Sequence, residues 1–249
     1  MIVYPNAKIN LGLNILRKRK DGYHDISSVF YPIKECVDIL EIVKSDTFEF
    51  VNTGIKISDD ENICVKAWKL LYKDHGIGNV KIHLHKQIPI GAGLGGGSSD
   101  ASFTLKALNE LFNLNLLNLE LEKYALLLGA DCPFFIDNRP KLVKGIGEKM
   151  INIDLDLSAF EIRLINPRLH ISTKKAYSRV VSQLPALSLE EIIKLPVSEW
   201  PKKLKNDFED TVFVQHSSIK DIKNQLYKEG AVYASMSGSG SVVYGIFEK

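Results

Sequence analysis

The residues from Gln87 to Asp100 read QIPIGAGLGGGSSD. Alternating apolar residues over 80–84 predict a strand that ends near Lys86, just before this glycine-rich run. Apolar residues that recur every three or four positions over 101–112 predict a helix just after it. Glycine lets a ligand approach the backbone closely, and the free N–H groups at a helix N-terminus attract an anion. The run is therefore typical of a loop that binds phosphate.

Other motifs also fit parts of this run. Residues 91–96 match the dinucleotide-binding pattern G-x-G-x-x-G, but the predicted helix leads to a second helix instead of the strand and acidic residue that this fold needs. The run lacks the Gly-Lys-Ser/Thr of a Walker A loop, and no V-A-I-K lysine of a protein kinase follows it. A loop without a ligand is disfavoured, because ordering so many glycines costs conformational entropy. The alternative that this protein is a dehydrogenase therefore depends on the G-x-G-x-x-G match alone.

Composition restricts the class of protein. The chain has 249 residues, of which 45% are hydrophobic and 25% charged, with a formal net charge of +2. These values are typical of a folded globular protein and give no argument for binding nucleic acid. The widely spaced Cys36, Cys64 and Cys132 indicate reduced thiols. No apolar run reaches about 18 residues, and the first residues do not resemble a secretory signal. We therefore expect a cytoplasmic protein with no membrane partner.

Periodicity along the rest of the chain predicts an α+β protein in two halves. Alternation over 9–15 predicts a half-buried strand, and Asp21-Gly22 predicts a hairpin turn. Asp60 and Glu61 provide an acidic start for a helix, and residues 145–153 predict a loop where the halves meet. Further strands are expected at residues 29–33, 39–43, 47–51, 162–165, 231–234 and 242–247. Further helices are expected at 63–71, 120–128 and 219–226, and helical segments interrupted by prolines over 173–204. We predict an N-terminal domain over residues 1–152 and a C-terminal domain over residues 153–249.

Two single residues are candidates for chemistry, although each has a plainer interpretation. Lys8 lies on the polar face of the first predicted strand, where a lysine is usually solvated. Asp131 follows Gly129 and precedes Cys132-Pro133, so it fits a helix N-cap. Phosphoryl transfer needs anion-binding groups, a metal and a group that orients or deprotonates the hydroxyl. Lys8, Asp131 and the glycine-rich run supply these residue types, but their spacing does not show that they converge.

Three further patterns also allow two interpretations. The run Ser237-Gly238-Ser239-Gly240 fits a hairpin turn between two strands as well as a functional loop. His83 and His85 fit a solvated strand face better than a metal site, because no third ligand is evident. The basic run from Arg17 to Lys20 fits a solvated hairpin tip, or a surface that attracts an anionic substrate.

Taken together, three motifs in this order resemble those of the GHMP small-molecule kinases. They are Pro5-Asn6-Ala7-Lys8-Ile9-Asn10-Leu11, Pro89-Ile90-Gly91-Ala92-Gly93-Leu94-Gly95-Gly96-Gly97-Ser98-Ser99 and Met236-Ser237-Gly238-Ser239-Gly240-Ser241. A second set resembles the branch that acts on a cytidine-diphosphate-linked methylerythritol: Asp21-Gly22-Tyr23-His24, Gly129-Ala130-Asp131-Cys132-Pro133-Phe134-Phe135 and Gly145-Ile146-Gly147-Glu148. The resemblance spans essentially the whole chain, and the ordered set is specific where any single motif is not.

The resemblance implies a two-domain α+β fold. Its N-terminal domain would resemble domain 2 of ribosomal protein S5 and hold the phosphate-binding loop, and its C-terminal domain would also be α+β. The implied reaction is phosphorylation by ATP of the 2-hydroxyl of the cytidine-diphosphate-linked methylerythritol, in the non-mevalonate route to isoprenoid precursors. Mg²⁺ would be carried on the phosphates, with no protein residue assigned as a metal ligand. The expected partner is this small molecule, and the expected state is a monomer or weak homodimer.

Roles in catalysis and ATP binding follow from matching positions. Asp131 would be the base that takes the hydroxyl proton. Lys8 would hold Asp131 anionic and stabilise the charge on the transferred phosphoryl group. Residues 89–99 would bind the phosphates of ATP, and Asn62 and Lys86 would lie near the adenine.

The substrate residues are also carried over by position. Asn10 would help to place the substrate, while Tyr23 and His24 would recognise the cytidine end. Tyr177 would be a second aromatic residue across the cytosine, on a looser match. Stacking and hydrogen bonds to the base edge are physically suited to selecting cytosine.

Small departures and two alternatives accompany the resemblance. Ala92 stands where many relatives have glycine, and Ser237 and Ser239 stand where threonine is common. Another GHMP kinase of the homoserine or mevalonate type is one alternative, which the Tyr23-His24 pair disfavours. A catalytically silent nucleotide-binding protein is the other, and the presence of Lys8, Asp131 and Ser99 disfavours it.

Overall fold

The computed structural model describes residues 1–57, 62–178, 180 and 182–249, and its chain divides into two compact units. The first unit contains Met1–Lys8, Pro32–Ile90 and Gly95–Arg139, and the second contains Ile9–Tyr31, Gly91–Leu94 and Pro140–Lys249. The predicted boundary between residues 152 and 153 stays a prediction. Asp60 and Glu61, the predicted acidic start of a helix, lie outside the described residues.

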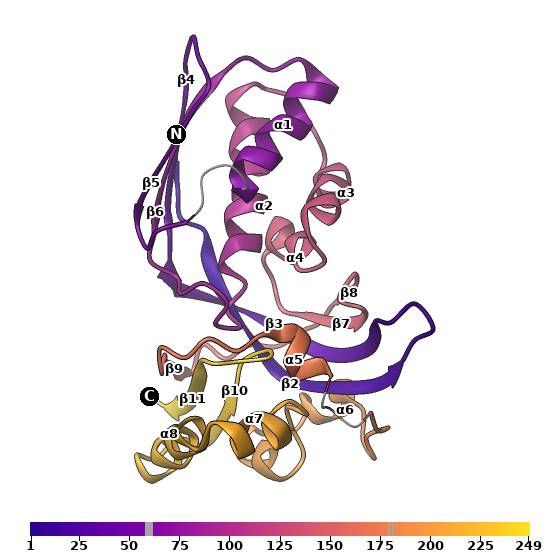
Figure 1. Cartoon of the computed structure of the whole chain (residues 1–249). Helices are drawn as coiled ribbons and strands as arrows, with labels where there is room; N and C mark the ends of the chain where they lie inside the picture. Colours follow the sequence, from indigo (N-terminus) through magenta and orange to yellow (C-terminus); the bar gives the residue numbers. More distant parts are fainter. Residues whose placement is uncertain (58–61, 179, 181) are drawn as a thin grey trace. The chain divides into compact units, whose positions relative to one another are not determined.

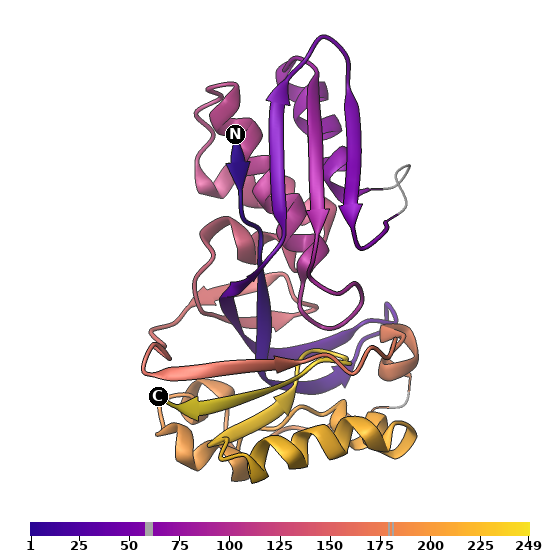
Figure 2. The same cartoon turned by 90° about the vertical axis from the view of Figure 1, so that its left-hand side faces the viewer.

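A four-stranded sheet forms one layer of the first unit. Its order is β1 (Ile2–Val3), β4 (Ile39–Lys44), β6 (Val80–Lys86) and β5 (Glu49–Gly54). β4 is antiparallel to β1 and β6, whereas β5 runs parallel to β6. Helices α1 (Ile63–His75), α2 (Gly96–Leu111), α3 (Asn118–Leu128) and α4 (Cys132–Asp137) lie together on one side of this sheet (Figures 1 and 2).

The core of the first unit lies between the sheet and these helices. Alternate residues of β6, including Ile82 and Leu84, face the apolar sides of α1 and α2, including Leu71 and Leu105, and all four are fully buried. Burying an aliphatic side chain of this size stabilises a fold by roughly 1.5–3 kcal/mol. This core fixes the end of β6 and the start of α2, and therefore the two ends of the glycine-rich run.

The second unit contains two sheets. One has the order β2 (Asn6–Lys18), β3 (His24–Val37), β7 (Lys141–Gly145) and β8 (Lys149–Asn152); the ends of β2 before Ile9 and of β3 after Tyr31 belong to the first unit. The other is antiparallel, with β11 (Val243–Glu248) between β10 (Tyr233–Met236) and β9 (Phe160–Ile165).

Short helices complete the second unit. They are α5 (Thr173–Tyr177), α6 (Leu189–Ile192), a 3-10 helix (Val197–Lys202), α7 (Glu209–Gln215) and α8 (Ser217–Lys228). Figure 2 shows α8 alongside β10 and β11. Ile219 and Leu226 of α8 pack with Met236 and Val243 of these strands in one buried cluster.

The predicted mixture of helices and strands is confirmed, with some differences in single elements. The first strand is buried throughout Asn6–Ile15, not on one face alone, because its polar side chains have partners inside the protein. Asn6, for example, exchanges amide hydrogen bonds with Asn138. The expected loop at 145–153 contains the turn after β7 and the strand β8, and β1, β7 and α7 were not predicted. No helix in the described part of the chain is long and apolar enough to cross a membrane.

Candidate active site

The glycine-rich run joins β6 to α2 and needs glycine at two points. Gly93 has φ of +81°, and a Cβ there would lie 2.0 Å from the carbonyl oxygen of Ser237. Gly95 has φ of +69° and is the N-cap residue of α2, where a Cβ would lie 3.0 Å from Cγ of Lys8. Any larger residue would be strained by the positive φ and would also have to displace its neighbours. The backbone of the run is therefore held close to other parts of its own unit at both points.

The N-terminus of α2 fits a phosphate group. The helix has 16 residues, begins at Gly96 and has no side chain capping its first amides. The first backbone N–H groups of a helix have no acceptor within it, so they are available to an anion. Ser99 adds a hydroxyl that is fully buried and without a hydrogen-bond partner among the described residues. A Cβ at Gly97 would meet nothing within 4 Å, so the approach to this turn is open.

A buried group of three ionisable side chains holds the start of this loop. Nζ of Lys86 forms ion pairs with Asp38 and, at 2.7 Å, with Oδ2 of Asp100. None of the three side chains is more than 3% exposed. The other oxygen of Asp38 accepts hydrogen bonds from the backbone N–H groups of Gln87, at 2.5 Å, and Ile88, at 2.8 Å. Asp38 therefore connects the end of β6 to the first residues of the loop.

Burial sets the protonation of this group. Burial raises the pKa of Asp100 to about 8, even though the Lys86 charge opposes the shift. Burial alone would lower the pKa of Lys86, but the carboxylates of Asp100 and Asp38 together raise it. When Asp100 is protonated, Lys86 is the one cation and Asp38 the one anion. This charge state has the lowest free energy for three buried groups.

Sequence reasoning placed Lys86 near a nucleotide but missed Asp38 and Asp100. Asp38 is 48 positions from Lys86 in the sequence, so no local pattern could have paired them. The role predicted for Lys86 stays a prediction.

Lys8 and Asp131 lie close together in the first unit, as a shared role in catalysis requires. Nζ of Lys8 lies 3.7 Å from Oδ2 of Asp131. The Lys8 side chain is 4% exposed, whereas that of Asp131 is 36% exposed. Burial lowers the pKa of Lys8, and Asp131 opposes this shift. The carboxylate of Asp131 is reached by solvent and lies beside the buried ammonium group of Lys8. A carboxylate in such a position can accept a proton from another group.

The hydrogen bonds at the start of α4 test whether the Asp131 side chain caps this helix. Asp131 occupies the N-cap position of α4, but its side chain makes no capping hydrogen bond. Its carboxylate is directed to Lys8 instead. The side chain is therefore not needed to begin the helix, which leaves its charge available for chemistry.

The serine-glycine run of the second unit forms the β10–β11 hairpin loop and contacts the glycine-rich run. The Ser237 hydroxyl donates to the carbonyl oxygen of Gly93 at 2.8 Å and accepts from the backbone N–H of Asn10 at 3.2 Å. The amide of Asn10 donates to Ser28 at 2.8 Å. The loop is thus a hairpin turn, as its composition predicts, and also a support for the glycine-rich run. The predicted contact of Asn10 with substrate stays a prediction.

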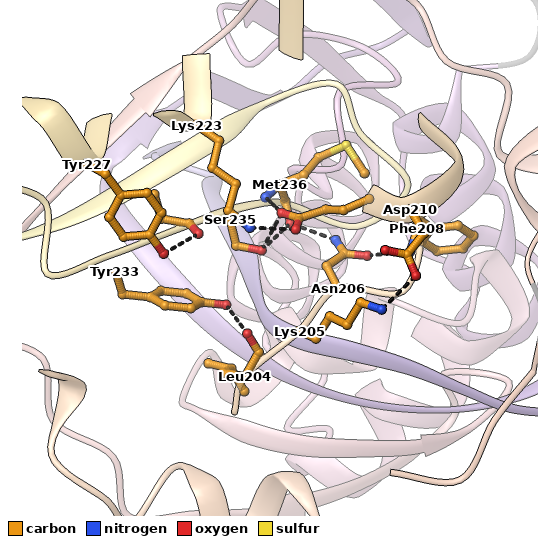
Figure 3. Close-up of polar contacts among 12 residues, drawn as sticks. Leu204, Lys205, Asn206, Phe208, Asp210, Lys223, Tyr227, Tyr233, Ser235 and Met236 are labelled. Carbon is orange, nitrogen blue, oxygen red and sulfur yellow. Dashed lines mark hydrogen bonds and ion pairs between the residues drawn. The ribbon is translucent and has the colours of Figure 1, made fainter. Parts of the chain in front are cut away.

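A polar network missed by sequence reasoning fixes this hairpin (Figure 3). The amide of Asn206 donates to the carbonyl oxygens of Met236, at 2.7 Å, and Gly238, at 2.9 Å. The carboxylate of Glu209 accepts from the Ser235 hydroxyl and the Met236 backbone N–H, and it pairs with Lys223. These partners come from segments separated widely in the sequence, so only the fold brings them together.

Three of the four predicted substrate residues line one cavity of the second unit. This aromatic cavity has a volume of about 710 Å³, and its lining includes Tyr23, His24 and Tyr177 together with Lys18 and Lys174. The rings of His24 and Tyr177 stack at 5.1 Å between centroids with an angle of 26°. Tyr23 is 61% exposed. Burial lowers the pKa of His24 below its ordinary 6.5, and Lys18 lowers it further, so the imidazole is neutral at neutral pH.

Two remaining candidates have structural partners. Asn62 is the N-cap of α1, and its side chain accepts from the Cys64 backbone N–H at 2.8 Å; its predicted place near adenine stays a prediction. His83 and His85 both contact the hydroxyl of Thr53 at 2.9 Å. No group of three metal-ligating side chains exists among the residues that the structure describes.

Comparisons with known proteins identify the family of this chain. The model described as GHMP kinases N terminal domain matches residues 62–138, and the one described as GHMP kinases C terminal matches residues 188–249. A relative from Azobacteroides pseudotrichonymphae genomovar. CFP2, named 4-diphosphocytidyl-2-C-methyl-D-erythritol kinase, is 52% identical over 100% of this chain and 94% of its own length. The chain belongs to the GHMP kinase family. A relative of the same name from Bacteroides thetaiotaomicron is 51% identical over 100% of this chain and 92% of its own length.

Two solved structures resemble this chain. A crystal structure of 4-(cytidine 5'-diphospho)-2C-methyl-D-erythritol kinase superposes with a TM-score of 0.86 at 32% identity, covering 99% of this chain and 90% of that one. A homoserine kinase from Cytophaga hutchinsonii gives a TM-score of 0.68 at 15% identity, covering 98% and 86%. The second likeness supports the fold alone.

Proposed function

We propose that this GHMP kinase transfers the γ-phosphoryl group of ATP to the 2-hydroxyl of 4-(cytidine 5'-diphospho)-2-C-methyl-D-erythritol. The observation that carries this choice within the family is the aromatic cavity, which places Tyr23, His24 and Tyr177 around one space of about 710 Å³. Flat rings stack on a base, and a neutral histidine both donates and accepts at a base edge. The relatives that are about half identical carry the corresponding name.

The proposed chemistry uses the pair formed by Lys8 and Asp131. Asp131 accepts the proton of the attacking hydroxyl, the hydroxyl oxygen bonds to the γ-phosphorus, and the bond to the β-phosphate oxygen breaks to release ADP. Lys8 supplies positive charge beside the carboxylate and the transferred group. Such a reaction needs positioning and electrostatic stabilisation and no covalent intermediate with the protein.

ATP would bind on the glycine-rich run. The amides at the start of α2 and the buried Ser99 hydroxyl suit its phosphates. Mg²⁺, carried on the phosphates, would neutralise part of their charge when bound. We further propose that the protein acts in the cytoplasm as a monomer or weak homodimer and requires no other macromolecule.

The test is coupled ADP release from the purified protein with a panel of alcohols. ADP should form when the cytidyl substrate is supplied and not with homoserine or mevalonate. Turnover with either of those two alone would move the protein to another branch of the family. ATP binding without transfer to any alcohol would instead favour the silent nucleotide-binding alternative.

A further inference from the structure

A second cavity of the second unit is lined mainly by basic side chains. This basic cavity has a volume of about 840 Å³ and lies where the β2–β3 and β7–β8 hairpins come together. Six of its lining residues are basic: Arg17, Lys18, Arg19, Lys20, Lys144 and Lys149. Two are acidic, Asp21 and Asp25, which leaves a formal charge of +4. Leu16 and Ile26 add apolar wall.

The two acidic residues of the basic cavity neutralise the charge of the arginines but not that of the lysines. Arg17 pairs with Asp25, while Arg19 pairs with Asp21 at 2.8 Å and with Asp25 at 3.4 Å. The four lysines of the basic cavity form no ion pair with any residue that the structure describes. The uncompensated charge therefore comes from lysines on three segments of one cavity.

Lys144 and Lys149 are held directly opposite each other. They are cross-strand partners in the antiparallel β7–β8 pair, and both are exposed. Like charges directly opposite on neighbouring strands destabilise a sheet, so this arrangement costs free energy unless an anion relieves it. The nearby carboxylate of Glu148 does not provide that relief, because it accepts from the Ile146 backbone N–H at 2.6 Å and packs over Gly145.

We propose that the basic cavity binds a small anion that carries two or more phosphate groups, either inorganic diphosphate or the diphosphate of a nucleotide. Lysine ammonium groups donate charge-assisted hydrogen bonds to phosphate oxygens. The cavity has the size of a small-ligand site, and its charges surround one space instead of forming the long stripe that nucleic acid needs. Lys18 also lines the aromatic cavity, so a nucleotide seated there could extend its phosphates toward the basic cavity.

The experiment is lysine footprinting of the full chain by amine acetylation, read by mass spectrometry, with sodium pyrophosphate or CDP as the probe. Pyrophosphate should slow the modification of Lys144 and Lys149 without changing that of Lys220 and Lys228, which are exposed on α8. In the Lys149→Gln variant, the concentration of pyrophosphate that protects Lys144 should rise by roughly tenfold. A Lys228→Gln variant should leave it unchanged.

CDP distinguishes the two sources of the phosphates. If CDP protects Lys144 at lower concentration than pyrophosphate does, and Tyr177→Leu removes this advantage, the diphosphate belongs to a nucleotide in the aromatic cavity. If CDP and pyrophosphate protect Lys144 at equal concentrations in both the wild type and Tyr177→Leu, the ligand is free diphosphate. Failure of both probes to protect, or protection by RNA alone, would overturn the proposal. The readout needs no turnover, so it stands or falls separately from the proposed kinase activity.

Discussion

The carboxylate of Asp131 is the single group on which the proposed chemistry depends most. Asp131→Asn keeps the shape of the side chain and removes its charge, and the α4 N-cap does not use that side chain. We expect kcat to fall by roughly 10²–10⁴, as for the loss of a general base, with the thermal midpoint almost unchanged. Steady-state kinetics and thermal unfolding measure the two effects. Asp221→Asn, on the exposed surface of α8, is the control. A normal kcat with a lowered midpoint would return Asp131 to a structural role.

The aromatic cavity should respond to pH through His24. Because the pKa of His24 is lowered, the neutral ring persists at neutral pH and is protonated only as the pH falls below that lowered value. We expect kcat/KM for the cytidyl substrate to be level around neutral pH and to fall on the acidic side. His24→Gln, which keeps a donor and an acceptor, should remove the contribution of the imidazole to that acidic limb. An identical limb in the variant would show that another group titrates.

Stacking in the same cavity gives a separate prediction. Tyr177→Leu should raise KM for the cytidyl substrate by roughly tenfold, the value of one lost base-aromatic contact, and leave KM for ATP unchanged. Tyr4→Leu, at a tyrosine that is 57% exposed and does not line the aromatic cavity, is the control. Equal changes in both KM values would indicate a general loss of structure.

The glycine-rich run is the element in which backbone geometry matters most. Gly93→Ala would place a methyl group 2.0 Å from a carbonyl oxygen at a positive φ. We expect this change to lower the thermal midpoint and to weaken ATP binding. Gly97→Ala meets no atom within 4 Å, so its midpoint should stay at the wild-type value. Equal midpoints for the two variants would contradict the packing described at Gly93.

Asp100 makes the stability of the β6–α2 connection depend on pH. Its pKa is about 8 in the folded protein against 3.8 for the ordinary group, so the folded state binds more protons than the unfolded state between these values. The contribution of Asp100 to stability is therefore lost as the pH rises. Relative to wild type, Asp100→Asn should become more stable as the pH is raised from about 5 to about 8. Chemical unfolding at several pH values measures the difference, and a difference that does not change with pH would contradict the assigned protonation.

At the scale of the whole molecule, patterns that are local in sequence were predicted well. The β6 strand, the α+β class and the hairpin at Asp21-Gly22 follow from periodicity and turn chemistry, which neighbouring residues determine. The pairing of Lys8 with Asp131 could be anticipated only through the family resemblance, since 123 positions separate them in the sequence.

The remaining features depend on contacts between distant segments. Asp38 and Asp100 around Lys86, and Asn206 and Glu209 around the β10–β11 hairpin, are ordinary polar residues in the sequence. Their importance comes from burial, which forces each polar group to find a partner. The β7–β8 hairpin was missed for a related reason, because β8 is short and mostly exposed and has little apolar pattern.

The central claim is phosphoryl transfer to one hydroxyl of a cytidyl substrate by the Lys8–Asp131 pair. Phosphorus NMR of the reaction product tests it most directly. With ATP and 4-(cytidine 5'-diphospho)-2-C-methyl-D-erythritol, we expect a new phosphomonoester signal coupled to the 2-position, and a much slower appearance of that signal with Asp131→Asn. A phosphomonoester at another position, or equal rates for the two proteins, would contradict the account.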